Sequence, residues 1–146
     1  MSSGGVPMRQ GFEVIEHPSD LGLDITAESR EGLFSEAVHG LLHVIGGDLP
    51  IRSADTRRIH LHAPDVQALF VRWLSEILYL YDGEKFLAGE TVVHRLTEHE
   101  IEATVRGERL NPRRHRVALD VKAVTYHQLC VEQTSDGWHA RVFLDI

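Results

Sequence analysis

The fold is decided by the last nine residues, which read WHARVFLDI at positions 138–146. Apolar residues recur at every second position, which is the pattern of a strand that buries one face. Asp136-Gly137 stands directly before this stretch, and an Asp-Gly pair between two strands is a strong hairpin signal. We therefore predict that the stretch is the second strand of a hairpin in an antiparallel sheet.

Outward from this strand, the chain reads as two helices among further strands. Ser29 is a good N-cap for a helix that Gly46-Gly47 ends. Pro64 opens a second helix at its first position, and Asp82-Gly83 ends it. Both helices carry apolar residues at helical spacing, which is typical of core helices. The expected strands cover residues 11–16, 21–27, 57–62, 86–96, 101–106, 117–132 and 138–146.

The element order is therefore β-β-α-β-α-β-β-β-β. Because hairpins outnumber crossovers, we predict an α+β fold with two amphipathic helices packed on a mainly antiparallel β-sheet. Residues 1–10 are mostly small and are expected to form a flexible leader. Residues 11–146 are expected to form a single domain, since a chain of this length suits one hydrophobic core.

The composition disfavours several classes of protein. A formal net charge of -7 argues against a chain that grips nucleic acid by itself, and favours a basic protein as partner. The single cysteine, Cys130, excludes an internal disulfide framework and is expected to be an inert sheet residue. No apolar run approaches the ~20 residues that cross a bilayer, and no secretion signal is evident. We expect a soluble cytoplasmic protein with no membrane partner.

Two anionic groups at the end of the sequence suggest a cation site. Asp145 lies one residue before the α-carboxylate of Ile146, and such a pair is costly unless a cation or N–H donors neutralise it. Asp20 would supply a third carboxylate if its strand pairs near Asp145. Oxygen ligands of this kind suit Ca²⁺ or Mg²⁺. The alternative is an ordinary strand end that binds no ion.

A second polar group lies in the expected strand 117–132. Lys122 and Tyr126 fall on one face of this strand and His127 on the other. This pattern is compatible with a functional surface or with a solvated sheet edge. The sequence contains no phosphate-binding loop, zinc-protease motif or nucleophile elbow. With one cysteine, the ten histidines do not favour a closed zinc site.

Four segments, in order along the chain, resemble the signature of the archease family. HPSDLG at 17–22 resembles the family's H-T-A-D-hydrophobic-G opening, and RGE at 106–108 its G-E element. DVKAVTYH at 120–127 resembles the E-V-K-A-x-T-Y-H signature, and LDI at 144–146 the D-I terminus. Pro18-Ser19 and Asp120 depart from the usual Thr-Ala and Glu. The resemblance covers residues 12–146.

The resemblance implies a small accessory protein of an RtcB-type RNA ligase, an enzyme that joins RNA ends in tRNA splicing and RNA repair. Such a protein promotes guanylylation of the ligase's active-site histidine and restores turnover, so it is an activator and not an enzyme, and meets RNA only through the ligase. By position, Asp20, Asp145 and the Ile146 carboxylate would bind a divalent cation, most often Ca²⁺, with Mg²⁺ and Mn²⁺ as alternatives. The positions expected to contact the ligase or its nucleotide are His17, Glu108, Lys122, Tyr126 and His127.

A second hypothesis assigns the same carboxylates to a stand-alone metal-dependent hydrolase. His17 or His127 would act as the general base, and Lys122 would stabilise developing negative charge. The activator needs a partner for any activity, whereas the hydrolase works alone. An assay of the purified protein therefore separates the two hypotheses.

Overall fold

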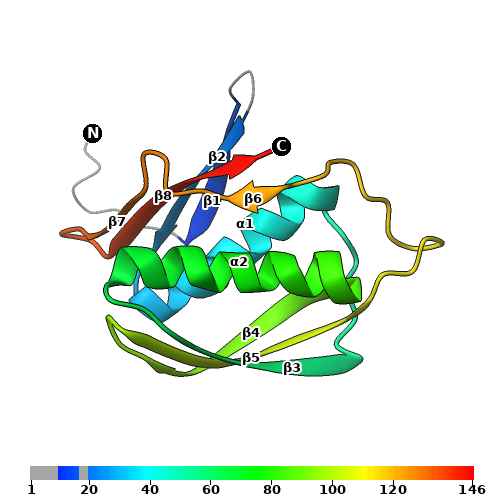
Figure 1. The fold of residues 1–146 in the computed structure, drawn as a ribbon, viewed down its shortest axis with the longest axis horizontal. Helices are drawn as coiled ribbons and strands as arrows, with labels where there is room; N and C mark the ends of the chain where they lie inside the picture. Colours follow the sequence, from blue (N-terminus) through cyan, green and yellow to red (C-terminus); the bar gives the residue numbers. More distant parts are fainter. Residues whose placement is uncertain (1–9, 17–19) are drawn as a thin grey trace.

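The computed structural model describes residues 10–16 and 20–146, so the expected leader lies almost wholly outside the described residues, as does His17. The elements confirm the α+β class and the predicted order along the chain (Figure 1). Their bounds are β1 (Gly11–Glu16), β2 (Asp20–Ala27), α1 (Arg30–Gly46), β3 (Asp55–His62), α2 (Val66–Glu84), β4 (Phe86–Leu96), β5 (Glu100–Arg109), β6 (Ala123–Val124), β7 (Cys130–Gln133) and β8 (Trp138–Asp145).

Two antiparallel sheets enclose the two helices. The five-stranded sheet has the order β1-β2-β8-β6, with β7 also paired to β8, and the three-stranded sheet has the order β3-β5-β4. Figure 1 shows α1 and α2 running between these sheets, and each helix contacts strands of both. β8, the strand that ends the chain, is the centre of the larger sheet because it pairs with β2 on one edge and with β6 and β7 on the other.

The ends of both helices are set by local capping. The Ser29 side chain accepts a hydrogen bond from the Gly32 N–H at 3.0 Å, and Gly47 ends α1 at a φ of 70°, as predicted. At α2 the N-cap is Asp65, whose side chain accepts a hydrogen bond from the Ala68 N–H at 2.8 Å. The helix therefore begins at Val66 and not at Pro64, as was predicted.

The end of α2 also differs from the prediction. Asp82-Gly83 lies inside the helix, which continues to Glu84 and ends where Lys85 takes a left-handed φ of 56°. The packing of the last turn outweighs the helix-breaking tendency of a single glycine, which costs about 1 kcal/mol. Neither helix in the described part of the chain is long and apolar enough to cross a membrane.

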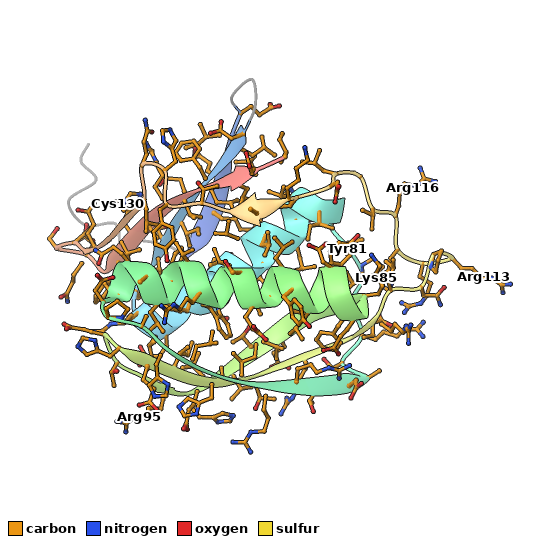
Figure 2. All side chains as sticks on the ribbon, viewed as in Figure 1. Tyr81, Lys85, Arg95, Arg113, Arg116 and Cys130 are labelled. Atoms are coloured by element: carbon orange, nitrogen blue, oxygen red, sulfur yellow. The ribbon has the colours of Figure 1, made fainter. Side chains whose placement is uncertain are left out.

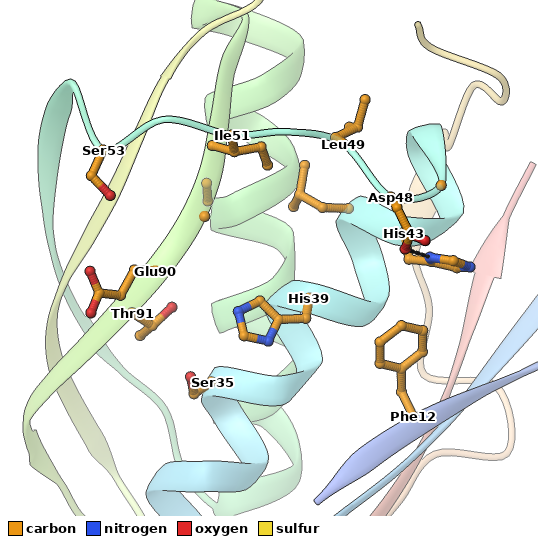
Figure 3. Close-up of a pocket in the computed structure, with 14 residues that line it drawn as sticks. Phe12, Ser35, His39, His43, Asp48, Leu49, Ile51, Ser53, Glu90 and Thr91 are labelled. Atoms are coloured by element: carbon orange, nitrogen blue, oxygen red, sulfur yellow. Dashed lines mark ion pairs between the residues drawn. The ribbon is translucent and has the colours of Figure 1, made fainter. Parts of the chain in front are cut away.

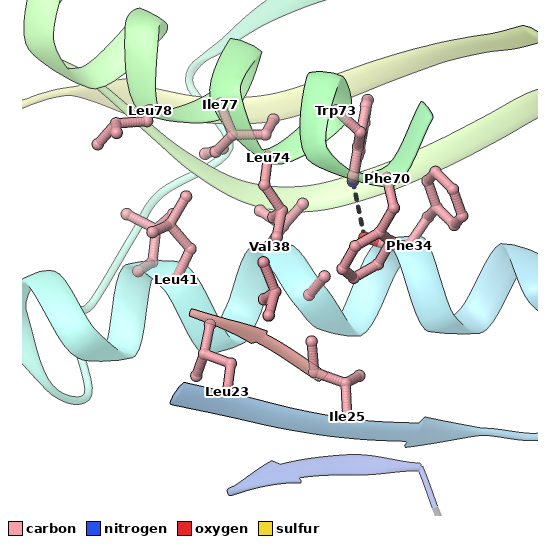
Figure 4. Close-up of a cluster of buried hydrophobic side chains, with 14 of the residues drawn as sticks. Leu23, Ile25, Phe34, Val38, Leu41, Phe70, Trp73, Leu74, Ile77 and Leu78 are labelled. Atoms are coloured by element: carbon pink, nitrogen blue, oxygen red, sulfur yellow. Dashed lines mark hydrogen bonds between the residues drawn. The ribbon is translucent and has the colours of Figure 1, made fainter. Parts of the chain in front are cut away.

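The core forms where the apolar stripes of α1 and α2 face each other (Figure 4). Phe34 of α1 packs edge-on against Phe70 of α2, with ring centroids 5.2 Å apart. The indole N–H of Trp73 donates to the Phe34 carbonyl at 2.8 Å, which satisfies a buried donor. The apolar stripe predicted for the second helix is therefore core. Leu23 and Ile25 of β2 close this core from the larger sheet.

The strand predicted over 117–132 is broken into two short pieces. β6 pairs only with Asp145 and Leu144, and β7 pairs with the opposite end of β8. Between them, the Thr125 N–H and hydroxyl both donate to the Phe143 carbonyl at 3.0 Å, and Gln128 takes a left-handed φ of 50°. The edge strand thus bulges outward over residues 125–129, which takes Tyr126 and His127 out of the strand alternation.

The hairpin predicted at Asp136-Gly137 is confirmed. β7 and β8 are joined by a turn in which Thr134 and Gly137 exchange backbone hydrogen bonds of 2.7 and 3.4 Å. Gly137 has a φ of 156°, and a Cβ placed there would lie 2.3 Å from the Ala27 carbonyl oxygen. Only glycine fits this close approach between the hairpin and β2.

Candidate functional site

The register between β2 and β8 places Asp20 directly opposite Asp145 at the rim of the larger sheet. Opposite residues of an antiparallel pair share a face, with Cβ atoms about 5 Å apart. Asp145 is exposed and Asp20 is half-buried. The condition on which the predicted cation site depended, pairing of the Asp20 strand near Asp145, is therefore met.

Ile146 follows Asp145 at the same rim. Its side chain is half-buried and packs against the hydrophobic core, so the residue after β8 is anchored to the fold. Like charges directly opposite each other destabilise a strand pair unless other groups offset them. The cation site at this rim stays a prediction. Hard carboxylate oxygens are the ligands that Ca²⁺ and Mg²⁺ take.

The segment after residue 120 borders this rim on the other edge of β8. Ala123 pairs with Asp145, and the Lys122 N–H donates to the Asp145 carbonyl at 2.8 Å. The Lys122 side chain is exposed. Asp20, Asp145 and Lys122 are far apart in the sequence. They lie on or beside β2, β8 and β6, which are neighbouring strands of the larger sheet (Figure 1).

The bulge after β6 carries the other two predicted contact residues of this segment. The His127 ring packs on Phe143 with centroids 5.7 Å apart, and the His127 backbone N–H donates to the Thr125 hydroxyl at 3.2 Å. Tyr126 is one of the most exposed large hydrophobic residues of the described chain, at 59%. Both side chains lie at the surface near the end of β8. The prediction that Lys122 and Tyr126 share one strand face is wrong, because the strand ends at Val124.

Glu108 lies elsewhere, buried in the smaller sheet on β5. Its carboxylate accepts the Arg52 backbone N–H at 2.7 Å and also binds the Arg114 guanidinium. His115 accepts the Asn111 N–H on Nδ1, so its Nε2 carries the proton and donates to Glu108 at 3.2 Å. The structure therefore does not bring Glu108 to the rim. His17 lies outside the described residues.

Comparison with known proteins identifies the family of this chain. The sequence profile described as the Archease protein family matches residues 12–146. The chain belongs to the archease family. It is 34% identical over 139 residues to protein archease of Methanosarcina mazei, covering 92% of this chain and 95% of that protein. It is 35% identical over 140 residues to protein archease of Saccharolobus solfataricus, covering 95% of this chain and 100% of that protein.

A solved archease-like structure supports the fold. The solution structure of Methanobacterium thermoautotrophicum protein 1598 superposes with a TM-score of 0.79 at 27% identity, covering 93% of this chain and 99% of that one. The family resemblance read from four short segments is therefore confirmed over nearly the whole chain. The family signature has segments near both ends of the domain, and these include Asp20 and Asp145. The two aspartates meet in the fold because β2 pairs with β8.

The Glu108 network of this archease gives a prediction about stability. Burial alone raises the pKa of the Glu108 carboxyl, but the Arg52 N–H and the Arg114 guanidinium lower it by more, so the net pKa is below its usual value. A lowered pKa stabilises the fold above the pKa of the unfolded state, and this stabilisation is lost as the pH falls through the folded pKa. We expect Glu108→Gln to lower the free energy of unfolding by about 1–3 kcal/mol at pH 7.

Urea denaturation at pH 7 and at about pH 3 tests this expectation. The cost of Glu108→Gln should shrink at the lower pH, because protonation of this carboxyl in the unfolded state removes part of the stabilisation that its lowered pKa provides. Exposed Glu98 provides the matched control, because Glu98→Gln removes the same charge without a buried network. A cost that is equal at both pH values, or equal for the two variants, would show that the network contributes nothing.

A groove of about 480 Å³ opens between α1 and β4, away from the rim (Figure 3). His39 and His43 of α1 line it, and His43 pairs with Asp48 at 3.3 Å. Glu90 and Thr91 of β4 face them across the groove. Of the predicted site residues that the structure describes, none lines this groove.

Two further groups of potential metal ligands were not predicted. Their members are His60, His62 and Glu100 on β3 and β5, and Cys130, Glu132 and His139 on β7 and β8. In each group the ligand atoms lie within 4.8 Å of one another. The two histidines of the first group lie on one strand face, but their acidic partner comes from a strand about 40 residues later. For the second group, the Asp136-Gly137 pair was the available sequence signal, because the hairpin that it predicts places His139 opposite Glu132.

Proposed function

We propose that this archease is an accessory protein that activates an RtcB-type RNA ligase by promoting its guanylylation and multiple turnover in tRNA splicing or RNA repair. Family membership over residues 12–146 supports the proposal. The observation that carries it is the register that sets Asp20 opposite Asp145 beside the segment at 122–127. Asp20, Asp145 and Lys122 thus lie on or beside neighbouring strands, which supports their acting together.

Asp20, Asp145 and the Ile146 carboxylate would hold the divalent cation, with Ca²⁺ favoured because every donor is a hard oxygen. The bound cation would neutralise this rim and offer open coordination positions to oxygen atoms of the ligase or its nucleotide. The donor set fits such an ion, since two of the three groups face each other across adjacent strands. Lys122, Tyr126 and His127 would contact the partner around the cation.

The charge of the chain agrees with a protein partner and not with direct RNA binding. A net charge of -7 opposes contact with phosphates, which requires clustered lysine and arginine. RNA would therefore be met through the ligase, in the cytoplasm. The chain would act as a cofactor protein, with the chemistry performed by the ligase.

The purified chain alone is expected to show no hydrolysis of nucleotides or RNA and no ligation, whereas it should restore multiple turnover to the cognate ligase. The test combines recovery of the ligase by pull-down from the source cell with a guanylylation assay on the recovered enzyme. His43→Ala, which alters the distant groove, serves as a control and should activate like wild type. Robust metal-dependent hydrolysis by the isolated chain would establish the hydrolase instead.

A further inference from the structure

A second cluster of potential ligands lies on the outer face of the larger sheet. Cys130 and Glu132 are two residues apart on β7, so their side chains share a face, and Glu132 lies opposite His139 of β8. His139 Nδ1 is 3.3 Å from the Glu132 carboxylate, and the Cys130 sulfur lies within 4.8 Å of both groups. Figure 2 shows Cys130 at the β7 end of this sheet.

We propose that Cys130 Sγ, the Glu132 carboxylate and His139 Nδ1 form a binding site for a borderline-soft divalent cation of the Zn²⁺ class. The three ligand atoms lie within 4.8 Å of one another. Tetrahedral Zn²⁺ with bond lengths of about 2.0–2.3 Å needs ligand separations of about 3.3–3.8 Å, so small side-chain rotations complete the set. Three protein ligands leave the fourth position open to water or to a ligand.

The His139 ring is already oriented for this role. Its Nε2 pairs with the Asp24 carboxylate of β2, which directs Nδ1 toward Glu132 and Cys130. Metal-binding histidines typically donate their second ring nitrogen to a carboxylate in this way, which fixes the tautomer and the ring plane. The ring is also three-quarters buried, with 24% of the side chain exposed. Asp24 therefore supports the site without binding the metal.

The charges around the cluster match a divalent ion. Arg141 pairs with Asp24 at 3.3 Å, so these two charges offset each other. Glu132 then leaves one negative charge for the cation to neutralise, and the Cys130 thiol adds a second when it loses its proton on metal binding. Burial raises the pKa of the Cys130 thiol, and the hydrogen bond to Glu132 raises it further. Cation binding therefore releases one proton from this thiol to solvent as the metal–sulfur bond forms.

This site differs in place and chemistry from the rim. His139 and Asp145 are six residues apart on β8, which corresponds to about 20 Å along the strand. The rim offers only oxygen ligands, whereas the cluster offers a thiolate and an imidazole, which select softer metals. The cluster of His60 and His62 with Glu100 has no sulfur and is more exposed, with 50% and 67% of the histidine side chains accessible.

Cobalt provides the test, because a thiolate bound to Co²⁺ produces a charge-transfer absorption band in the near ultraviolet. Cys130 is the only cysteine of the chain, so this band reports on one ligand. We expect wild type to develop the band with one equivalent of Co²⁺ and to lose it when Zn²⁺ is added. Cys130→Ser should lack the band, and Glu132→Gln should weaken Co²⁺ binding by about tenfold or more.

The control removes the competing histidine cluster. His60→Ala combined with His62→Ala should leave both the band and its titration midpoint unchanged. Circular dichroism and urea denaturation of the metal-free proteins would show that each variant is folded. No band in wild type at saturating Co²⁺, or equal Zn²⁺ affinity in wild type and folded Cys130→Ser, would overturn the site. Loss of the band in the double histidine variant would overturn the assignment of its ligands.

Discussion

Ca²⁺ binding is expected to fall by about tenfold or more when either Asp20 or Asp145 is replaced by asparagine, and to become unmeasurable in the double variant. Each substitution removes one of two carboxylates that face each other across β2 and β8. Affinity for Ca²⁺ depends on the number of anionic oxygen ligands, so removing both leaves too few to displace its hydration shell. The metal-free fold should be unchanged or slightly more stable, because the repulsion between like charges is also removed.

Isothermal titration calorimetry with Ca²⁺ measures this effect directly. Asp136→Asn is the matched control, because it removes one exposed carboxylate from the hairpin of β8 and leaves an Asn-Gly turn that is equally compatible with the hairpin. It should bind Ca²⁺ like wild type. Unchanged affinity in both Asp20→Asn and Asp145→Asn would remove the rim site, and an effect confined to one of them would reduce it to that residue.

A C-terminal tag is expected to weaken Ca²⁺ binding and to abolish activation of the ligase, whereas an N-terminal tag should be harmless. Appending residues to Ile146 converts its α-carboxylate into a neutral amide and adds bulk at the rim where the partner approaches. Residues 1–10 lie outside the family match, so an N-terminal extension leaves the matched residues unchanged. The Ile146 side chain stays packed against the core in either form, so the fold should survive.

Thermal melts with and without Ca²⁺ quantify the difference between the two tagged forms. At a Ca²⁺ concentration of 100 times its Kd, binding stabilises the N-tagged protein by about 2.7 kcal/mol. A tenfold loss of affinity in the C-tagged protein would reduce this stabilisation to about 1.4 kcal/mol. Equal stabilisation of both forms, together with equal activation, would exclude the chain end from the site and leave an ordinary strand end.

The helices and the last hairpin could be predicted because local residues determine them. Ser29 and Gly47 cap α1 through contacts within one turn, and Gly137 is required by the turn that it occupies. The ends of α2 were less predictable. Asp65 replaced Pro64 as the boundary because its side chain reaches the Ala68 N–H, and both residue types are compatible with a helix start.

The break between β6 and β7 could not be predicted, because its cause is not local. Residues 117–132 have strand-forming composition throughout, but Thr125 bonds to the carbonyl of Phe143, a residue 18 positions later. The outward bulge also lets the His127 ring cover Phe143. Nothing in the sequence indicates that these groups meet. The predicted strand, with its alternating side chains, therefore covers too many residues.

The candidate site was predictable only in part for the same reason. The acidic character of Asp20 and Asp145 is evident from the sequence, but a shift of one residue in register would place them on opposite faces. Glu108 belongs to a family motif, yet it is buried, and it binds the Arg52 N–H from a distant loop together with nearby Arg114 and His115. Cys130 was expected to be inert, because nothing in its own strand indicates that His139 lies beside it.

The most direct test of the account measures multiple-turnover RNA ligation by the cognate RtcB-type ligase in the presence of wild type or the double variant of Asp20→Asn and Asp145→Asn. Both proteins are used at equal concentration with Ca²⁺ present, after circular dichroism has shown that both are folded. We predict that wild type restores turnover and guanylylation of the ligase, whereas the double variant leaves the ligase at its unassisted level. Equal stimulation by the two proteins would contradict the claim that the paired aspartates of β2 and β8 support activation.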